Sequence, residues 1–208
     1  MPLLPLWLLL CAVAARPGCI ETVAGGGSGV PPLFSEPSFM TLDATQSIVF
    51  SAGNGVYRAV DGTTTGGVMQ LAGGKAPGSS GDGLPAFAAK MTSPRGICLL
   101  PSGDIVVSDS GNNRLRRLAK DLNIYAFAGS GVAGFAGDGG EALAGKLSAP
   151  WDLECAPDGG VYVADKSNHA IRHISPPING LRTLSTLAGK GRRGWGGMAP
   201  PASSPPRR

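Results

Sequence analysis

The 208-residue chain has few aromatic residues and few charged ones, at 6% and 15%. It also lacks any long stretch in which apolar residues recur at the 3.6-residue spacing of an amphipathic helix. A helical bundle is therefore excluded. Since 42% of the residues are hydrophobic and they fall in short β-branched runs, disorder is excluded as well. With 33 Gly and 18 Pro, the composition predicts a turn-rich, all-β protein.

The chain also lacks the patterns of a metal centre. It has no CxxC pair, and its two histidines are His169 and His173. On a helix, an i, i+4 pair of histidines would lie on one face and could bind a metal together. Here the two histidines are expected to flank a turn of one blade, so they do not suggest a metal site. The glycines of two Gly-Asp-Gly loops supply tight backbone turns, because no phosphate-binding Gly-Lys-Ser/Thr follows them. We therefore expect no metal, no cofactor and no catalytic residue.

The excess of positive charge lies at the C-terminus. Five of the 18 basic residues lie from Lys190 onward, where no acid is found, and the other 13 are balanced by the 14 acidic residues. A body without net positive charge does not favour nucleic acid as a partner. The last residues, 198–208, are rich in Pro, Ser and Arg, a composition typical of a disordered tail.

One segment of the sequence is repeated. Residues 72–118 align with 128–174 at a constant offset of 56, without a gap and with 16 of 47 positions identical. Each unit contains short β-branched runs separated by a Pro-x-Gly turn and an Asn-containing turn, which predicts four antiparallel strands. Four short strands per repeat describe a blade of a β-propeller. An earlier copy around 37–60 is degenerate, so we expect three blades, at about 37–74, 94–130 and 150–189.

The repeat resembles the NHL repeat. The segment "GKLSAPWDLECAPDGGVYVADKSNHAIRHI" has the Pro before the first strand, the turn with Asp-Gly, the Tyr-Val-Ala-Asp strand end and the Asn-x-x-Ile-Arg that mark it. Rings of this family close with about six blades, so the resemblance implies a partial propeller over residues 19–197. "IETVAGGG" (20–27) would be an orphan N-terminal strand, the fourth strand of a blade whose other strands are absent.

The N-terminus resembles an export signal. Its apolar run is too short to cross a bilayer and ends in small residues, so residues 1–18 are interpreted as a signal peptide, although no basic residue precedes the run. This predicts a secreted or lumenal protein without a stable membrane anchor. Three blades would leave two apolar end faces uncovered, and either a second copy closes the ring as a homodimer or an unidentified protein partner covers them.

Two groups of residues stand out in the repeat. The first is structural: Asp109 and Asp165 end a strand, and their carboxylates are expected to accept N–H groups in the turn that follows. The Asn of each turn and an Arg on the next strand would be their companions. These are Asn112, Arg116, Asn168 and Arg172.

The second group is a candidate binding surface. Arg95, Trp151 and Asp152 directly follow the loop prolines, at the start of what would be inner strands. In a propeller this position forms the rim of one mouth of the channel, and Trp and Arg are frequent binding anchors.

The cysteines do not suggest a bridge. Cys98 and Cys155 lie on equivalent strands of neighbouring repeats but one residue out of register, which places them on opposite faces of their sheets. We therefore predict that they are not bonded to each other.

For function, the sequence favours a non-catalytic NHL-repeat module that binds a protein. Two alternatives stay open. The chain could be a fragment of a propeller lyase or hydrolase, which would need metal ligands from several blades, or an RNA-binding NHL propeller.

Overall fold

The computed structural model describes residues 37–60, 67–74 and 76–189, and these form three four-stranded antiparallel sheets. Each sheet uses four consecutive strands in chain order, so each is one blade. Blade 1 contains β1 (Pro37–Leu42), β2 (Ile48–Ala52), β3 (Gly55–Val60) and β4 (Gly67–Gly73). Blade 2 contains β5 (Pro94–Leu99), β6 (Ile105–Asp109), β7 (Arg114–Leu118) and β8 (Ile124–Ala128). Blade 3 contains β9 (Pro150–Cys155), β10 (Val161–Asp165), β11 (Ala170–Ile174) and β12 (Leu184–Gly189). The expected all-β fold of three four-stranded blades is confirmed.

Short turns join the strands. The Pro-x-Gly turns after β5 and β9 place Gly103 and Gly159 at φ values of +85° and +87°, where a side chain would be strained. The turns after β6 and β10 are single 3₁₀ turns, η2 (Ser110–Asn112) and η3 (Lys166–Asn168). A third such turn, η1 (Ala86–Ala88), lies in the long loop before β5.

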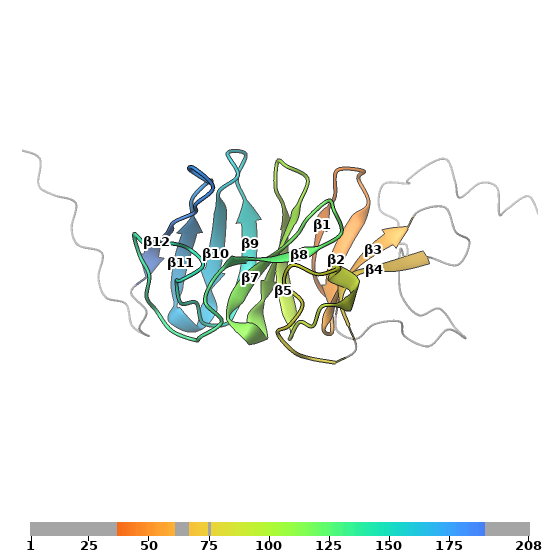
Figure 1. Cartoon of the computed structure of the whole chain (residues 1–208), viewed down its shortest axis with the longest axis horizontal. Helices are drawn as coiled ribbons and strands as arrows, with labels where there is room; N and C mark the ends of the chain where they lie inside the picture. The colour runs from red at the N-terminus through yellow and green to blue at the C-terminus, as the bar shows by residue number, and fades with distance from the viewer. Residues whose placement is uncertain (1–36, 61–66, 75, 190–208) are drawn as a thin grey trace, which may run out of the picture.

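The blades stack side by side in chain order, and Figure 1 shows them in a row. Their first strands, β1, β5 and β9, lie next to one another and form the inner edge of the arc. The core consists of apolar side chains between adjacent sheets. One cluster, with Val106, Leu115 and Val163, joins blades 2 and 3. Another, with Val49, Val56 and Val107, joins blades 1 and 2. Each sheet is therefore stabilised by its neighbours.

The prediction for the cysteines was wrong. Cys98 on β5 and Cys155 on β9 form a disulfide, with Cα atoms 5.5 Å apart. Their shift of one residue does put the two side chains on opposite faces of equivalent strands. In a stack of sheets, however, the face of one blade meets the opposite face of the next. The shift is therefore what brings the two sulfur atoms together.

The expected N-terminal signal, the orphan strand at 20–27 and the C-terminal tail lie outside the described residues. Within the described ranges, we find no helix that is long and apolar enough to cross a membrane.

Reduction of the disulfide should destabilise the stack. We expect the free energy of unfolding to fall by about 2–4 kcal/mol in reductant, because the bond closes a long loop between blades. Denaturant unfolding with and without reductant measures this. The Cys98→Ala/Cys155→Ala variant is the control, and its stability should not respond to reductant. Peptide mapping after alkylation without reduction should recover Cys98 linked to Cys155; free thiols at both positions would contradict the assignment.

Candidate functional site: the rim of the inner strands

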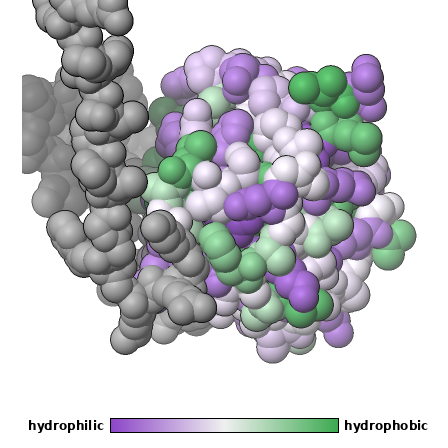
Figure 2. Space-filling view, turned by 90° about the vertical axis from the view of Figure 1, so that its left-hand side faces the viewer, coloured by the Kyte–Doolittle hydropathy of each residue, from purple (hydrophilic) through white to green (hydrophobic). Residues whose placement is uncertain are grey.

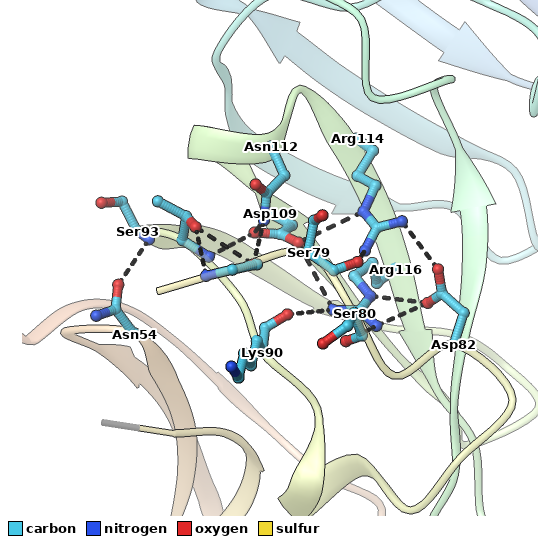
Figure 3. A network of polar contacts seen from close by, with 12 residues as sticks. Asn54, Ser79, Ser80, Asp82, Lys90, Ser93, Asp109, Asn112, Arg114 and Arg116 are labelled. Atoms are coloured by element: carbon cyan, nitrogen blue, oxygen red, sulfur yellow. Dashed lines mark hydrogen bonds and ion pairs between the residues drawn. The ribbon is translucent and has the colours of Figure 1, made fainter. Parts of the chain in front are cut away.

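A buried arginine ties the Gly-Asp-Gly loop of blade 2 to the sheet (Figure 3). Arg116 on β7 is completely buried. Its Nε donates to Asp82 Oδ1 at 2.9 Å, and its Nη1 donates to the Lys90 carbonyl at 2.7 Å. Asp109 Oδ1 accepts the Thr92 N–H at 2.9 Å and Asn112 Nδ2 at 2.8 Å. The long loop between β4 and β5 is therefore held at its middle, by Asp82, and at its end, by Lys90 and Thr92.

Blade 3 repeats this arrangement. Arg172 is buried, and its Nη2 donates to Asp138 Oδ1 at 2.8 Å. Asp165 accepts the Ser148 N–H at 2.7 Å and Asn168 Nδ2 at 2.7 Å. In each of the two blades the structure thus brings together the Asp, the Asn and the Arg that the sequence grouped as structural.

Two details differ from the expected arrangement. The backbone N–H groups that Asp109 and Asp165 accept come from the loop that precedes their blade, whereas the turn that follows their strand contributes the side-chain amide of its Asn. The shortest ion pair of Arg116 is with Asp82, at 2.7 Å, whereas Asp109 lies at 3.7 Å. Asp82 and Asp138 were missed as partners, although their recurrence at the repeat offset was a usable signal.

Burial acts on both charges of the blade 2 network. It raises the pKa of Asp109, against hydrogen bonds from Thr92 and Asn112 and the charges of Arg116 and Arg114. Burial also lowers the pKa of Arg116, against the Asp82 charge. The folded chain therefore keeps a proton on Asp109 at a pH where the unfolded chain has released it. The contribution of this carboxyl to stability falls as the pH rises above its ordinary value of 3.8.

Removal of the buried arginine should loosen the loop. We expect Arg116→Ala to lower the free energy of unfolding by about 3–5 kcal/mol, because it leaves Asp82 and the loop carbonyls without their donor and removes a positive charge beside the buried Asp109. The matched control is Arg117→Ala on the same strand, since Arg117 is half-exposed and pairs with Asp104. Its expected loss is about 1 kcal/mol or less. Equal losses in denaturant unfolding would contradict this account.

The second group lies at the start of the inner strands. The Arg95 guanidinium lies 4.7 Å from the centroid of the Trp151 ring, and Lys166 Nζ lies 3.5 Å from the same centroid. Arg95 Nη1 donates to Ser38 Oγ at 2.7 Å. Ser38, Arg95 and Trp151 occupy the same position in the three blades, so the rim is a continuous row of side chains. We call Arg95, Trp151 and Lys166 the rim cluster.

Asp152 lies beside the rim cluster and is exposed. Its carboxylate accepts the adjacent Leu153 N–H at 2.9 Å. Asp152 and Glu154 border a groove of about 350 Å³ along the inner strands, together with residues of β1 and β5. The free face of blade 3 was expected to be apolar, but at its inner strand, β9, it carries the exposed acidic side chains of Asp152 and Glu154. The structure brings Arg95 and Trp151 into contact and places Asp152 at the edge of this groove.

A close approach of two strands positions Trp151. A Cβ atom added at Gly96 would lie 2.7 Å from Asp152 Cα, from Leu153 N and from the Trp151 carbonyl oxygen. Only a residue without a side chain permits β9 to lie this close to β5.

Gly96→Ala should therefore separate β5 from β9. We expect a loss of about 1–3 kcal/mol in the free energy of unfolding, since the clash is with backbone atoms that cannot rotate away. Gly74→Ala is the control, because its added Cβ would meet nothing closer than 4.0 Å. Thermal unfolding of both variants measures the difference, and matching midpoints would argue against the close approach.

Among the described residues, no three His, Cys, Asp or Glu side chains are grouped so that they could hold a metal ion. His169 follows η3 in the left-handed region, at φ 51°, and the His173 ring lies against Tyr162 with centroids 4.9 Å apart. The two histidines thus lie in one blade, blade 3.

Comparison with known families identifies the repeat. The model of the NHL repeat matches residues 91–118, which cover β5, β6 and β7. The chain therefore contains an NHL repeat, within a fold of propeller-type blades.

Its relatives are much longer proteins. The chain is 30% identical over 151 residues to Protein SUPPRESSOR OF QUENCHING 1, chloroplastic, of Arabidopsis thaliana, a match that covers 68% of this chain and 14% of the relative. It is 33% identical over 103 residues to Teneurin-1 of Homo sapiens, covering 43% of this chain and 4% of that protein. This NHL-type chain therefore corresponds to a small part of these relatives.

The fold is also found in solved structures. An auxiliary nutrient binding protein from Bacteroides ovatus superposes with a TM-score of 0.57 at 18% identity, covering 69% of this chain and 38% of that one. At this identity the similarity concerns the fold alone.

Proposed function

We propose that this partial propeller is a non-catalytic binding module, and that the rim cluster receives an acidic segment of a protein partner. The supporting observation is that Arg95 forms no ion pair with an acid among the described residues. Of the seven arginines that the structure describes, five form ion pairs with acids. Arg182 instead donates to two backbone carbonyls. Arg95 contacts a hydroxyl and an aromatic ring, so its charge is available to a ligand.

The chemistry of the cluster favours an acidic ligand. A guanidinium held against an indole ring keeps a fixed orientation and presents its N–H groups to a carboxylate. Lys166, which lies over the same ring, adds a second positive charge. Trp and Arg together are the residue types that most often dominate binding energy at protein interfaces.

The proposal includes export from the cytosol. The Cys98–Cys155 disulfide supports it, because structural disulfides persist in oxidising compartments and are rare in the cytosol. Together with the export signal expected at residues 1–18, this favours a secreted or lumenal location.

The test measures peptide binding. A fluorescein-labelled alternating Glu-Tyr peptide should bind the full chain, and an alternating Lys-Tyr peptide should not. Arg95→Ala should raise the dissociation constant of the acidic peptide about tenfold, through the loss of one charged anchor. Lys120→Ala is the control, since Lys120 is an exposed lysine outside the rim cluster.

A single-stranded oligouridine distinguishes the alternative partner. Tighter binding of this RNA than of the acidic peptide, lost equally in Arg95→Ala, would replace the protein partner with a nucleic acid. Binding of the acidic peptide that is insensitive to Arg95→Ala would refute the assigned site.

A further inference from the structure

A groove lies between blades 2 and 3 at the end of the sheets opposite the rim cluster. Its volume is about 370 Å³, a size typical of small-molecule pockets. Arg95 and Trp151 stand at the beginning of β5 and β9, whereas the groove is bordered by Leu100 and Ser102, which follow the last residue of β5. Its other border is the loop between β11 and β12, which projects at the upper end of the row in Figure 1. The groove is therefore separate from the rim cluster.

The loop between β11 and β12 places the side chain of Arg182 in this groove. Asn179 and Gly180 have φ values of 51° and 80°, as the type I′ turn that Asn-Gly favours requires. Across this turn, Ile178 and Leu181 exchange two backbone hydrogen bonds of 2.8 and 3.0 Å. The backbone of Arg182, the next residue, is thereby held in a fixed position.

The guanidinium of Arg182 is oriented on one edge and on one face. Its Nη1 donates to the Gly159 carbonyl at 2.8 Å and to the Ser175 carbonyl at 3.0 Å. Its Cζ lies 4.5 Å from the centroid of the buried Phe127 ring. The other edge, formed by Nε and Nη2, donates to no residue that the structure describes. Two parallel N–H groups of this kind match the two oxygens of a carboxylate.

Asp104 lines the groove but is already paired. Its Oδ2 accepts from Arg117 Nη1 at 2.7 Å, and its Oδ1 accepts the Lys120 N–H at 3.2 Å. Burial, and after it the charge of Arg117, lowers the pKa of Arg182. The two guanidinium groups are thus close enough to repel each other, and an anion in the groove would offset this repulsion.

Glu141 also lines the groove, but its side chain projects away from Arg182. It pairs with Thr183 in an antiparallel bridge, and the N–H of the following Ala142 donates to the Arg182 carbonyl at 2.8 Å. Because side chains alternate along paired segments, Glu141 projects to one face of this pair and Arg182 to the other. Glu141 is accordingly exposed, whereas Ala142 is buried. Within the described ranges, the charge of Arg182 therefore has no acidic partner.

The repeat indicates that the fold itself does not require an arginine at this position. Ala86 is the equivalent of Ala142, and its N–H donates to the Leu122 carbonyl at 2.9 Å. Leu122 thus holds the position of Arg182 in blade 2, and its side chain is 73% exposed. The arginine packed on Phe127 is therefore a feature of this groove and not of every blade.

Apolar side chains surround the charged part of the groove. Leu143 and Leu181 line it and are 43% and 60% exposed, and Pro177 lines it as well. Figure 2, which views the molecule from the blade 3 side, shows hydrophobic residues at the upper edge of that side, the end at which the loop after β11 projects in Figure 1. A ligand with an apolar body would remove these side chains from water while its charged group contacts Arg182.

We propose that this groove binds a small organic acid, a carboxylate joined to an aliphatic body. The two carboxylate oxygens accept from Nε and Nη2 of Arg182, and the hydrocarbon chain packs against Leu143 and Leu181. The site is independent of the rim cluster, so it does not rest on the acidic partner proposed for Arg95.

Isothermal titration calorimetry of the full chain with hexanoate tests this site. Hexanoate should bind, and hexanamide, which has the same shape without the charge, should bind about tenfold more weakly. The affinity should also rise from acetate to hexanoate, because each added methylene group meets the apolar wall.

Three variants locate the binding. Arg182→Gln should raise the dissociation constant of hexanoate about tenfold, since glutamine keeps a donor for the carbonyls but loses the charge and the paired N–H groups. Leu143→Asp changes an exposed position, leaves the contacts of Arg182 intact, and should also weaken binding by placing a like charge at the mouth. Arg95→Ala is the control and should leave the affinity for hexanoate unchanged, which separates this site from the rim cluster.

Two outcomes would overturn the proposal. They are equal affinity for hexanoate and hexanamide, and hexanoate binding that neither Arg182→Gln nor Leu143→Asp weakens. A peptide that ends in leucine with a free carboxylate identifies the source of the ligand. Binding of this peptide that depends on Arg182, without binding of hexanoate, would replace the small acid with the terminus of a protein chain.

Discussion

A four-stranded sheet buries an apolar face only against a neighbouring sheet, and this constraint governs the whole molecule. Val106 and Leu115 are buried because blade 3 covers them, and Val49 and Val56 because blade 2 does. Polar contacts between blades also fix the position of each blade relative to the next. Ser51 and Ser108 donate to the first strand of the following blade, so each blade fixes where the next one begins.

Much of the fold was accessible from the sequence, because the repeat is strict where the backbone is constrained. The Pro-x-Gly turns and the prolines at which β5 and β9 begin defined the strands of blades 2 and 3. The Asp, Asn and Arg of each repeat also proved to lie in one network. The partner that sequence reasoning missed was Asp82, because the distance from the Gly-Asp-Gly loop to Arg116 is set by tertiary folding and not by a local pattern.

The prediction that Cys98 and Cys155 are not bonded failed for a different reason. The argument from register considered the two faces of one sheet, whereas the bond forms between the facing surfaces of two stacked sheets. When a side chain points toward the next blade, its equivalent in that blade points away from it. Contacts between blades therefore join residues that are one position out of register, as Cys98 and Cys155 are. The contact between Arg95 and Trp151 follows from the same stacking, since equivalent rim positions lie beside each other along the arc. Lys166 entered the rim cluster from a 3₁₀ turn, and no strand periodicity predicts its direction.

The disulfide between β5 and β9 also changes how the molecule bears load. Its cysteines are 57 residues apart in sequence and belong to adjacent inner strands. If the chain is pulled from its two ends, tension passes directly through the sulfur–sulfur bond. The strands β6, β7 and β8 then carry none of it, and about 190 Å of contour length cannot be extended. Residues 99–154 are thereby a protected segment, whereas blade 1 and the later strands of blade 3 take the force.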